Sequence, residues 1–216
     1  GLDLDEAMLA AARERLAVFG EGAATLHAAN YADFPAILAQ LGLPAVDHLL
    51  LDVGVNSAQV EDAGRGFSFD RDGPLDMRYD RSGGPTAADL VNGLSERELS
   101  DLFYFNAQEP ASRKIARRIC QVRHSGRITT TLALARAVES AMMAAGLWHP
   151  GKIHPATRVF QALRIAVNGE LDNLRRFMTQ AAAHLRPGGK LAVISFHSLE
   201  DGIVKQAVRE GKAAGV

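Results

Sequence analysis

The residues best suited to chemistry lie where an apolar run, Leu49-Leu50-Leu51, closes on Asp52 and then Gly54. Such a run predicts a buried strand of a parallel sheet, and open α/β sheets bind ligands at the carboxyl ends of their strands. A carboxylate there could orient an amine and take up its proton, or it could only bind the amino end of a ligand. Asp52 is therefore our candidate for a catalytic and a binding residue, and the two roles stay open.

Asp3 and Tyr31 occupy similar positions, each after a short strand candidate. An acidic residue that ends the second strand of a Rossmann-like unit accepts hydrogen bonds from ribose hydroxyls; the alternative for Asp3 is a surface carboxylate. Tyr31 could stack on a purine or simply pack. The glycine loop that accompanies such an acid lies about 20 residues upstream, which is before Gly1. We therefore expect the sequence to be a fragment of a longer protein.

The segment from residues 62 to 78 combines Gly, Phe and Pro with alternating Asp and Arg. We interpret it as too polar for a core and as suited to a binding loop on a rigid scaffold. Its carboxylates lack the glycine and final glutamate of an EF-hand loop, and the interleaved arginines favour ion pairing. The seven histidines show no zinc-ligand spacing, so we expect no metal site.

The net charge of −1 hides an asymmetry between the two parts of the chain. Residues 1–80 hold 5 Lys/Arg against 14 Asp/Glu, whereas residues 81–216 hold 19 against 11. The densest basic run covers residues 113–127 and contains no acid. Such a run is an electrostatic footprint for phosphate, and the alternative is a solvated helix face. The predicted RNA-binding residues of this run are Arg113, Lys114, Arg117 and Arg118.

Strands and helices must position these residues, and the apolar periodicity predicts that they alternate. One expected strand ends at Asp3, and the other three cover residues 25–28, 46–53 and 190–196. The expected helices cover residues 5–19, 34–41, 86–146 in several pieces, 155–185 and the segment after 198. This order predicts an α/β fold with a mostly parallel, doubly wound sheet. Residues 86–148 form an all-helical insertion between two parts of the core, residues 1–85 and 149–216.

Local signals predict where several of these elements begin and end. Ser95 and Glu98 have the spacing of a capping box, and Ser198 with Asp201 suggests a cap for the final helix. A break is expected near Asn168-Gly169, and a turn at Pro187-Gly188-Gly189.

Four long blocks cover LDVGVNSAQ (residues 51–59), RGFSFDRDGPLDMR (65–78), HPATRVFQALRI (154–165) and ISFHSLED (194–201). They resemble the bacterial small-subunit ribosomal RNA cytosine-N4 methyltransferase family. The resemblance implies a Rossmann-like class I core that uses S-adenosyl-L-methionine to methylate a cytidine of the decoding region. It also implies that the substrate is small-subunit ribosomal RNA or the assembled small subunit.

The resemblance places the cofactor contacts on Asp3, Tyr31, Asp52 and Gln59. Arg158 and His197, in the third and fourth blocks, complete the predicted RNA-binding residues. Tyr31 stands where the family usually has Phe, so the ring is kept. Other departures from the usual pattern are Asn56 and Ala58 for Ser and Pro, and Gly202 for Arg. The family's glycine-containing first loop and its C-terminal tail have no counterpart in this sequence, so the resemblance implies a fragment that lacks both termini and is itself inactive.

Composition narrows the class of protein further. The single cysteine, Cys120, suits a reducing compartment, and no apolar run approaches the length of a membrane span. We therefore expect a cytoplasmic protein with no membrane partner. A serine hydrolase is disfavoured because no G-x-S-x-G elbow is present. Two other classes stay open: a non-catalytic RNA-binding protein on the same fold, and a nicotinamide-dependent oxidoreductase.

Overall fold

The computed structural model describes residues 1–149 and 153–215 and separates into two compact units. One unit joins Gly1–Gly54 to Glu170–Val216, and the other is Val55–Gly169. Within the described ranges, no helix is both long and apolar enough to cross a membrane.

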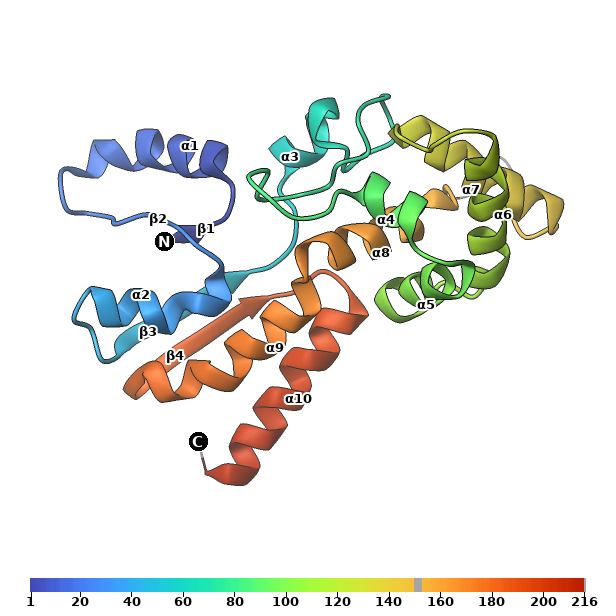
Figure 1. Cartoon of the computed structure of the whole chain (residues 1–216). Coiled ribbons are helices and arrows are strands. Elements are labelled where there is room, and N and C mark those ends of the chain that lie inside the picture. The colour runs from blue at the N-terminus through green and yellow to red at the C-terminus, as the bar shows by residue number, and fades with distance from the viewer. Residues whose placement is uncertain (150–152, 216) are drawn as a thin grey trace. The chain divides into compact units, whose positions relative to one another are not determined.

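The first unit contains two pairs of parallel strands (Figure 1). Strand β1 (Leu2–Asp3) pairs with β2 (His27–Ala28), and β3 (Val46–Asp52) pairs with β4 (Leu185–Ile194). The expected parallel pairing is thus confirmed. The expected single sheet is not formed, because no strand among the described residues joins the two pairs.

Strand β4 begins earlier than the sequence predicts. The predicted turn at Pro187-Gly188-Gly189 is wrong, since these residues lie inside β4. They lie at a shift in the strand register. Val46 pairs with Leu185 and His48 pairs with Lys190, so an advance of two residues along β3 matches an advance of five residues along β4. Gly188 has φ of +81°, and a Cβ on Gly189 would lie 2.8 Å from the Asp47 carbonyl oxygen. The turn-forming residues therefore make a bulge instead of ending the strand.

Helices α2 (Phe34–Gln40), α9 (Glu170–Ala181) and α10 (Ser198–Ala214) pack against the β3–β4 pair, together with the short turns η2 (Tyr31–Asp33) and η4 (Ala182–His184). Helix α1 (Glu6–Leu16), followed by the turn η1 (Ala17–Phe19), contacts β1 and β2 instead. Helix α9 places Leu174, Phe177 and Met178 in the core, at helical spacing. Alternation along β3 buries Leu51 and leaves Leu50 72% exposed.

The second unit is helical. It contains α3 (Ser57–Glu61), η3 (Ala63–Arg65), α4 (Ala87–Gly93), α5 (Glu96–Ala107), α6 (Ser112–Ser125), α7 (Thr131–Ala144) and α8 (Ala156–Asn168). The segment expected to be helical, residues 86–148, lies within this unit. The capping box of Ser95 and Glu98 is confirmed at the start of α5. The break predicted near Asn168-Gly169 is also confirmed, since Gly169 ends α8 with φ of +60°.

The polarity of the segment from residues 62 to 78 predicts that it lies outside the core, but the structure buries part of it. Leu75 and Met77 are only 1% and 0% exposed and belong to the core of the second unit. Arg65 is buried because its guanidinium donates to the carbonyls of Arg78 and Tyr79. Polar side chains can enter a core where each finds such partners.

Candidate functional site

Asp52 is the last residue of β3 and is exposed. Its carboxylate makes no hydrogen bond or ion pair with the residues that the structure describes. The next residue, Val53, still donates to the Ile194 carbonyl, and Gly54 then turns the chain away with φ of +97°. The parallel strand pair therefore holds a carboxylate at its carboxyl edge, as the sequence predicts.

Asp3 ends β1 in the same way but has a local partner. One of its oxygens accepts the Asp5 backbone N–H at 2.8 Å, and Asp5 in turn caps α1 by accepting from Ala7 N–H. Asp3 thus helps to fix the turn from β1 into α1.

Tyr31 opens the turn η2 after β2, and its ring packs edge-on against Phe177 of α9, with 5.9 Å between centroids. Its hydroxyl donates to the Glu170 carbonyl at 3.3 Å. Burial raises the pKa of the Tyr31 phenol far above its ordinary value, and the nearby charges of Glu170 and Glu200 add to the effect. Tyr31 is therefore a neutral donor that joins η2 to the start of α9.

His197 lies between β4 and α10, and it changes how the final helix begins. The predicted cap of Ser198 and Asp201 is wrong: the N-cap is His197, which forms a capping box with Glu200. The Glu200 carboxylate accepts the backbone N–H groups of Phe196 and His197 at 2.8 and 3.2 Å. His197 Nε2 also lies 3.2 Å from Glu200 Oε1. The spacing His-x-x-Glu has the capping-box form, so this pair could have been found in the sequence.

Glu200 is buried and charged. Burial acts to raise its pKa, but hydrogen bonds from His197 and from the Phe196 backbone outweigh burial and hold the pKa of Glu200 below its ordinary value. The half-buried His197 therefore has a structural partner, and contact of His197 with RNA stays a prediction.

Gln59, in the second unit, also caps a helix. Its side-chain oxygen accepts the Asn56 N–H at 3.1 Å, and the Asn56 oxygen accepts the Gln59 N–H at 2.9 Å. The two residues thus form a capping box at the start of α3. Asn56, a departure from the family pattern, is accommodated because asparagine is a good N-cap.

The basic residues predicted to bind RNA differ in their surroundings. Arg113 and Lys114 are exposed on α6 and pair with no carboxylate among the described residues. Arg117 lies 3.4 Å from Glu96, and Arg118 is only half-exposed. Arg158, on α8, is exposed and lies 3.9 Å from the buried Glu109. Arg113 and Lys114 are therefore the freest cations of the basic run.

Two other basic residues of the same run are structural. Arg123 donates to the carbonyls of Val91 and Leu94 at 2.8 and 2.6 Å, at the end of α4. Arg127 lies 3.7 Å from Asp89. Fewer positive charges of the basic run are therefore available to a ligand than the number of its basic residues indicates.

The structure thus divides the predicted residues between the two units. Asp3, Tyr31, Asp52 and His197 belong to the first unit, whereas Gln59 and the basic residues of α6 and α8 belong to the second. Within the first unit, Asp52 pairs in register with Ile194, three residues before His197.

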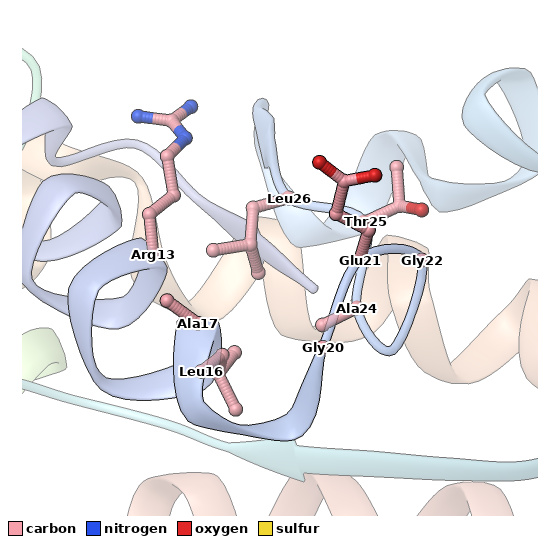
Figure 2. A pocket seen from close by; sticks show the side chains of 9 residues that line it. All are labelled: Arg13, Leu16, Ala17, Gly20, Glu21, Gly22, Ala24, Thr25 and Leu26. Atoms are coloured by element: carbon pink, nitrogen blue, oxygen red, sulfur yellow. The ribbon is translucent and has the colours of Figure 1, made fainter.

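A hollow of about 330 Å³ in the first unit contains none of the predicted residues. It lies beyond the end of α1, and its lining includes Leu16, Leu26, Arg13 and Glu21 (Figure 2). This hollow is open to solvent and does not coincide with a strand end.

The parallel strand pairs and the helices define an α/β protein in which β1 and β3 each end on an aspartate. A family model described as the MraW methylase family matches residues 1–215. The chain belongs to this family, which confirms the resemblance inferred from the sequence.

Similar proteins agree with this assignment. The chain is 52% identical over 210 residues to a protein of Sorangium cellulosum and 53% identical over 209 residues to one of Syntrophotalea carbinolica. Both are named ribosomal RNA small subunit methyltransferase H. The matches cover 97% of this chain but 65% and 66% of these relatives, so the chain spans just under two thirds of their length.

Proposed function

We propose that the protein transfers a methyl group from S-adenosyl-L-methionine to the exocyclic N4 of a cytidine in the decoding region of small-subunit ribosomal RNA. The observation that carries the proposal is the exposed Asp52 carboxylate at the carboxyl end of β3, which pairs with none of the described residues, in a chain of the MraW methylase family. The names of the relatives supply the substrate class.

The residues at the strand ends fit this cofactor by their chemistry. Asp3 is an acid at the end of β1, and ribose hydroxyls donate to an acid at such a position. The ring of Tyr31 offers an apolar surface for the purine. When bound, the sulfonium supplies an electrophilic methyl group.

The cytosine amine is a weak nucleophile, and the protein must orient it for reaction. The lone pair of the cytosine amine is delocalised into the ring, so the reaction depends on orientation and on an acceptor for the amine proton. Asp52 could orient the amine and accept its proton, or it could bind the amino end of the cofactor. Both roles use the same exposed carboxylate, and they predict different defects when its charge is removed.

The substrate base must leave its stack to reach any such site. Binding of the surrounding RNA then requires cations for its phosphates, and we assign this role to Arg113 and Lys114 on α6, with Arg158 on α8. These side chains are exposed, whereas the half-buried Arg123 donates to backbone carbonyls at the end of α4.

Calorimetry with S-adenosyl-L-methionine and with a reduced nicotinamide cofactor tests the cofactor class. We expect binding of the first alone, weakened about tenfold or more by Asp3→Asn because a charge-assisted hydrogen bond is lost. Asparagine keeps an oxygen for the Asp5 N–H, so the turn into α1 is preserved. Binding of the nicotinamide cofactor alone would favour the oxidoreductase, and binding of neither would favour a non-catalytic RNA-binding protein.

Asp52→Asn separates the two roles of Asp52. If Asp52 binds the cofactor, calorimetry shows weaker binding. If it prepares the amine, cofactor affinity is kept and the rate of methyl transfer falls. Unchanged affinity and rate would remove Asp52 from the site.

A further inference from the structure

Helix α5 carries two large aromatic side chains on its outer surface. Tyr104 and Phe105 are 54% and 66% exposed, although they follow the fully buried Phe103. Their rings contact each other edge to face, with 5.3 Å between centroids. An exposed aromatic pair on a helix whose other face is well packed has no role in the core of its own unit.

The neighbouring helices hold this pair in a fixed place. Glu96 contacts Arg117, and the hydroxyls of Ser100 and Ser112 lie 3.2 Å apart, so α5 and α6 run antiparallel. Tyr104 lies one helical turn beyond Ser100, toward the start of α6. On the other side, Asn106 donates to the Ala162 carbonyl of α8. The aromatic pair therefore stands at the end of a rigid helix and not on a loop.

Exposed basic residues lie on α6 and α8, the two helices that pack against α5. Arg113 and Lys114 begin α6 just after the short connection from α5, and neither pairs with a carboxylate of the described chain. Arg158 of α8 lies 3.9 Å from Glu109, which belongs to the same connection and is buried. The nearest exposed acid on this face of α5, Asp101, lies 3.8 Å from Arg97. The surface around the aromatic pair thus complements a polyanion.

We propose that Tyr104 and Phe105 form a stacking platform for unpaired bases of RNA, whose phosphates contact Arg113, Lys114 and Arg158. Aromatic rings beside a basic surface are how proteins bind single-stranded nucleic acid, because every base has a π-face to stack. The proposal rests on the proposed function for the natural RNA, a segment of small-subunit ribosomal RNA that is opened when the target base is extruded.

Fluorescence anisotropy with a labelled 12-nucleotide oligocytidylate tests the platform. The protein should bind it, and Phe105→Ala should weaken binding roughly fivefold or more, as expected for the loss of one stacked base. The log–log salt dependence should stay unchanged, because stacking releases no counterions. Circular dichroism should show an intact fold, because the side chain is exposed.

Three further variants make the test specific. Phe105→Trp keeps a π-face and should bind at least as tightly as the wild type, whereas Phe105→Leu keeps apolar area and should bind as poorly as Phe105→Ala. Met143→Ala, which removes a side chain that is 53% exposed on α7, should change nothing. Wild-type affinity for Phe105→Leu would show that the surface recognises apolar groups, as a protein partner would supply, and would overturn the proposal. So would unchanged affinity of Phe105→Ala, or no binding by the wild type.

The failure of this proposal can be told apart from failure of the proposed function. If the variants behave as expected but the protein transfers no methyl group to ribosomal RNA, the platform stands and the methyl-transfer proposal fails. If methyl transfer occurs and Phe105→Ala binds and reacts like the wild type, the platform alone is wrong.

Discussion

Asn168 and Tyr79 are joined by a hydrogen bond, although they lie 89 residues apart: the Tyr79 backbone N–H donates to Asn168 Oδ1 at 2.8 Å. The Asn168 amide also donates to the Met77 carbonyl at 2.8 Å. Met77 has φ of +65°, which a non-glycine residue rarely adopts. The end of α8 therefore holds residues 77–79 in a strained conformation.

Asn168→Ala should lower the free energy of unfolding by about 1–3 kcal/mol, because it leaves partly buried backbone groups unpaired. Asn168→Asp keeps an acceptor for Tyr79 but places a carboxylate oxygen against the carbonyl oxygens of Met77 and Arg164, so it should not restore stability. Urea denaturation measures both. Equal stability of Asn168→Ala and the wild type would show that the contact does not hold the loop.

Gly66 and Gly73 should tolerate no side chain. A Cβ on Gly66 would lie 2.2 Å from the Pro74 carbonyl oxygen, and one on Gly73 would lie 2.0 Å from that of Ala63. Alanine at either position should lower the free energy of unfolding by about 1–3 kcal/mol or more, since backbone must move. Gly83→Ala is the matched control, because its Cβ would meet nothing within 4 Å. A thermal melt in which all three variants resemble the wild type would contradict this packing.

Glu200 should make stability depend on pH in the acid range. Its pKa is lower in the folded protein than the ordinary value of 4.5. Ionised Glu200 therefore stabilises the fold above pH 4.5, and this contribution is lost as the pH falls through the lowered pKa. Glu200→Gln keeps one oxygen that can accept the two backbone N–H groups, but it cannot ionise. The wild type should be more stable than Glu200→Gln at pH 7, and the difference should shrink below pH 4.5. A difference that is constant from pH 7 to pH 3 would argue against an ionised carboxylate here.

The exposed cations of α6 should determine the salt dependence of RNA binding. Replacing Arg113 and Lys114 by Gln should weaken RNA binding and reduce the log–log salt slope by roughly 0.7 per lost contact with a single strand. Cofactor affinity should not change. Arg123→Gln should instead destabilise the fold, because Arg123 bonds to the end of α4. An unaltered slope in the double variant would leave α6 as a solvated helix face.

Much of the fold follows from local patterns in the sequence. The apolar run before Asp52 predicts β3, the spacing of Ser95 and Glu98 predicts the start of α5, and Asn168-Gly169 predicts the end of α8. In each case the signal and the structure it predicts lie within a few residues of each other.

Two features of the structure depend on distant partners and could not be predicted. Pro187-Gly188-Gly189 looks like a turn, but pairing with β3 makes it a bulge. Arg123 looks like part of a basic patch, yet its acceptors lie about 30 residues earlier in the chain. Neither relationship can be found from spacing alone, because tertiary contacts override local preference.

The most direct test of the proposed function is to follow the methyl group. Small-subunit ribosomal RNA that lacks this methylation is incubated with the full-length protein and isotopically labelled S-adenosyl-L-methionine, then digested to nucleosides and examined by mass spectrometry. We predict label in N4-methylcytidine, lost or strongly reduced in Asp52→Asn. Label in another nucleoside, or no label in RNA while the cofactor binds, would contradict the proposed reaction.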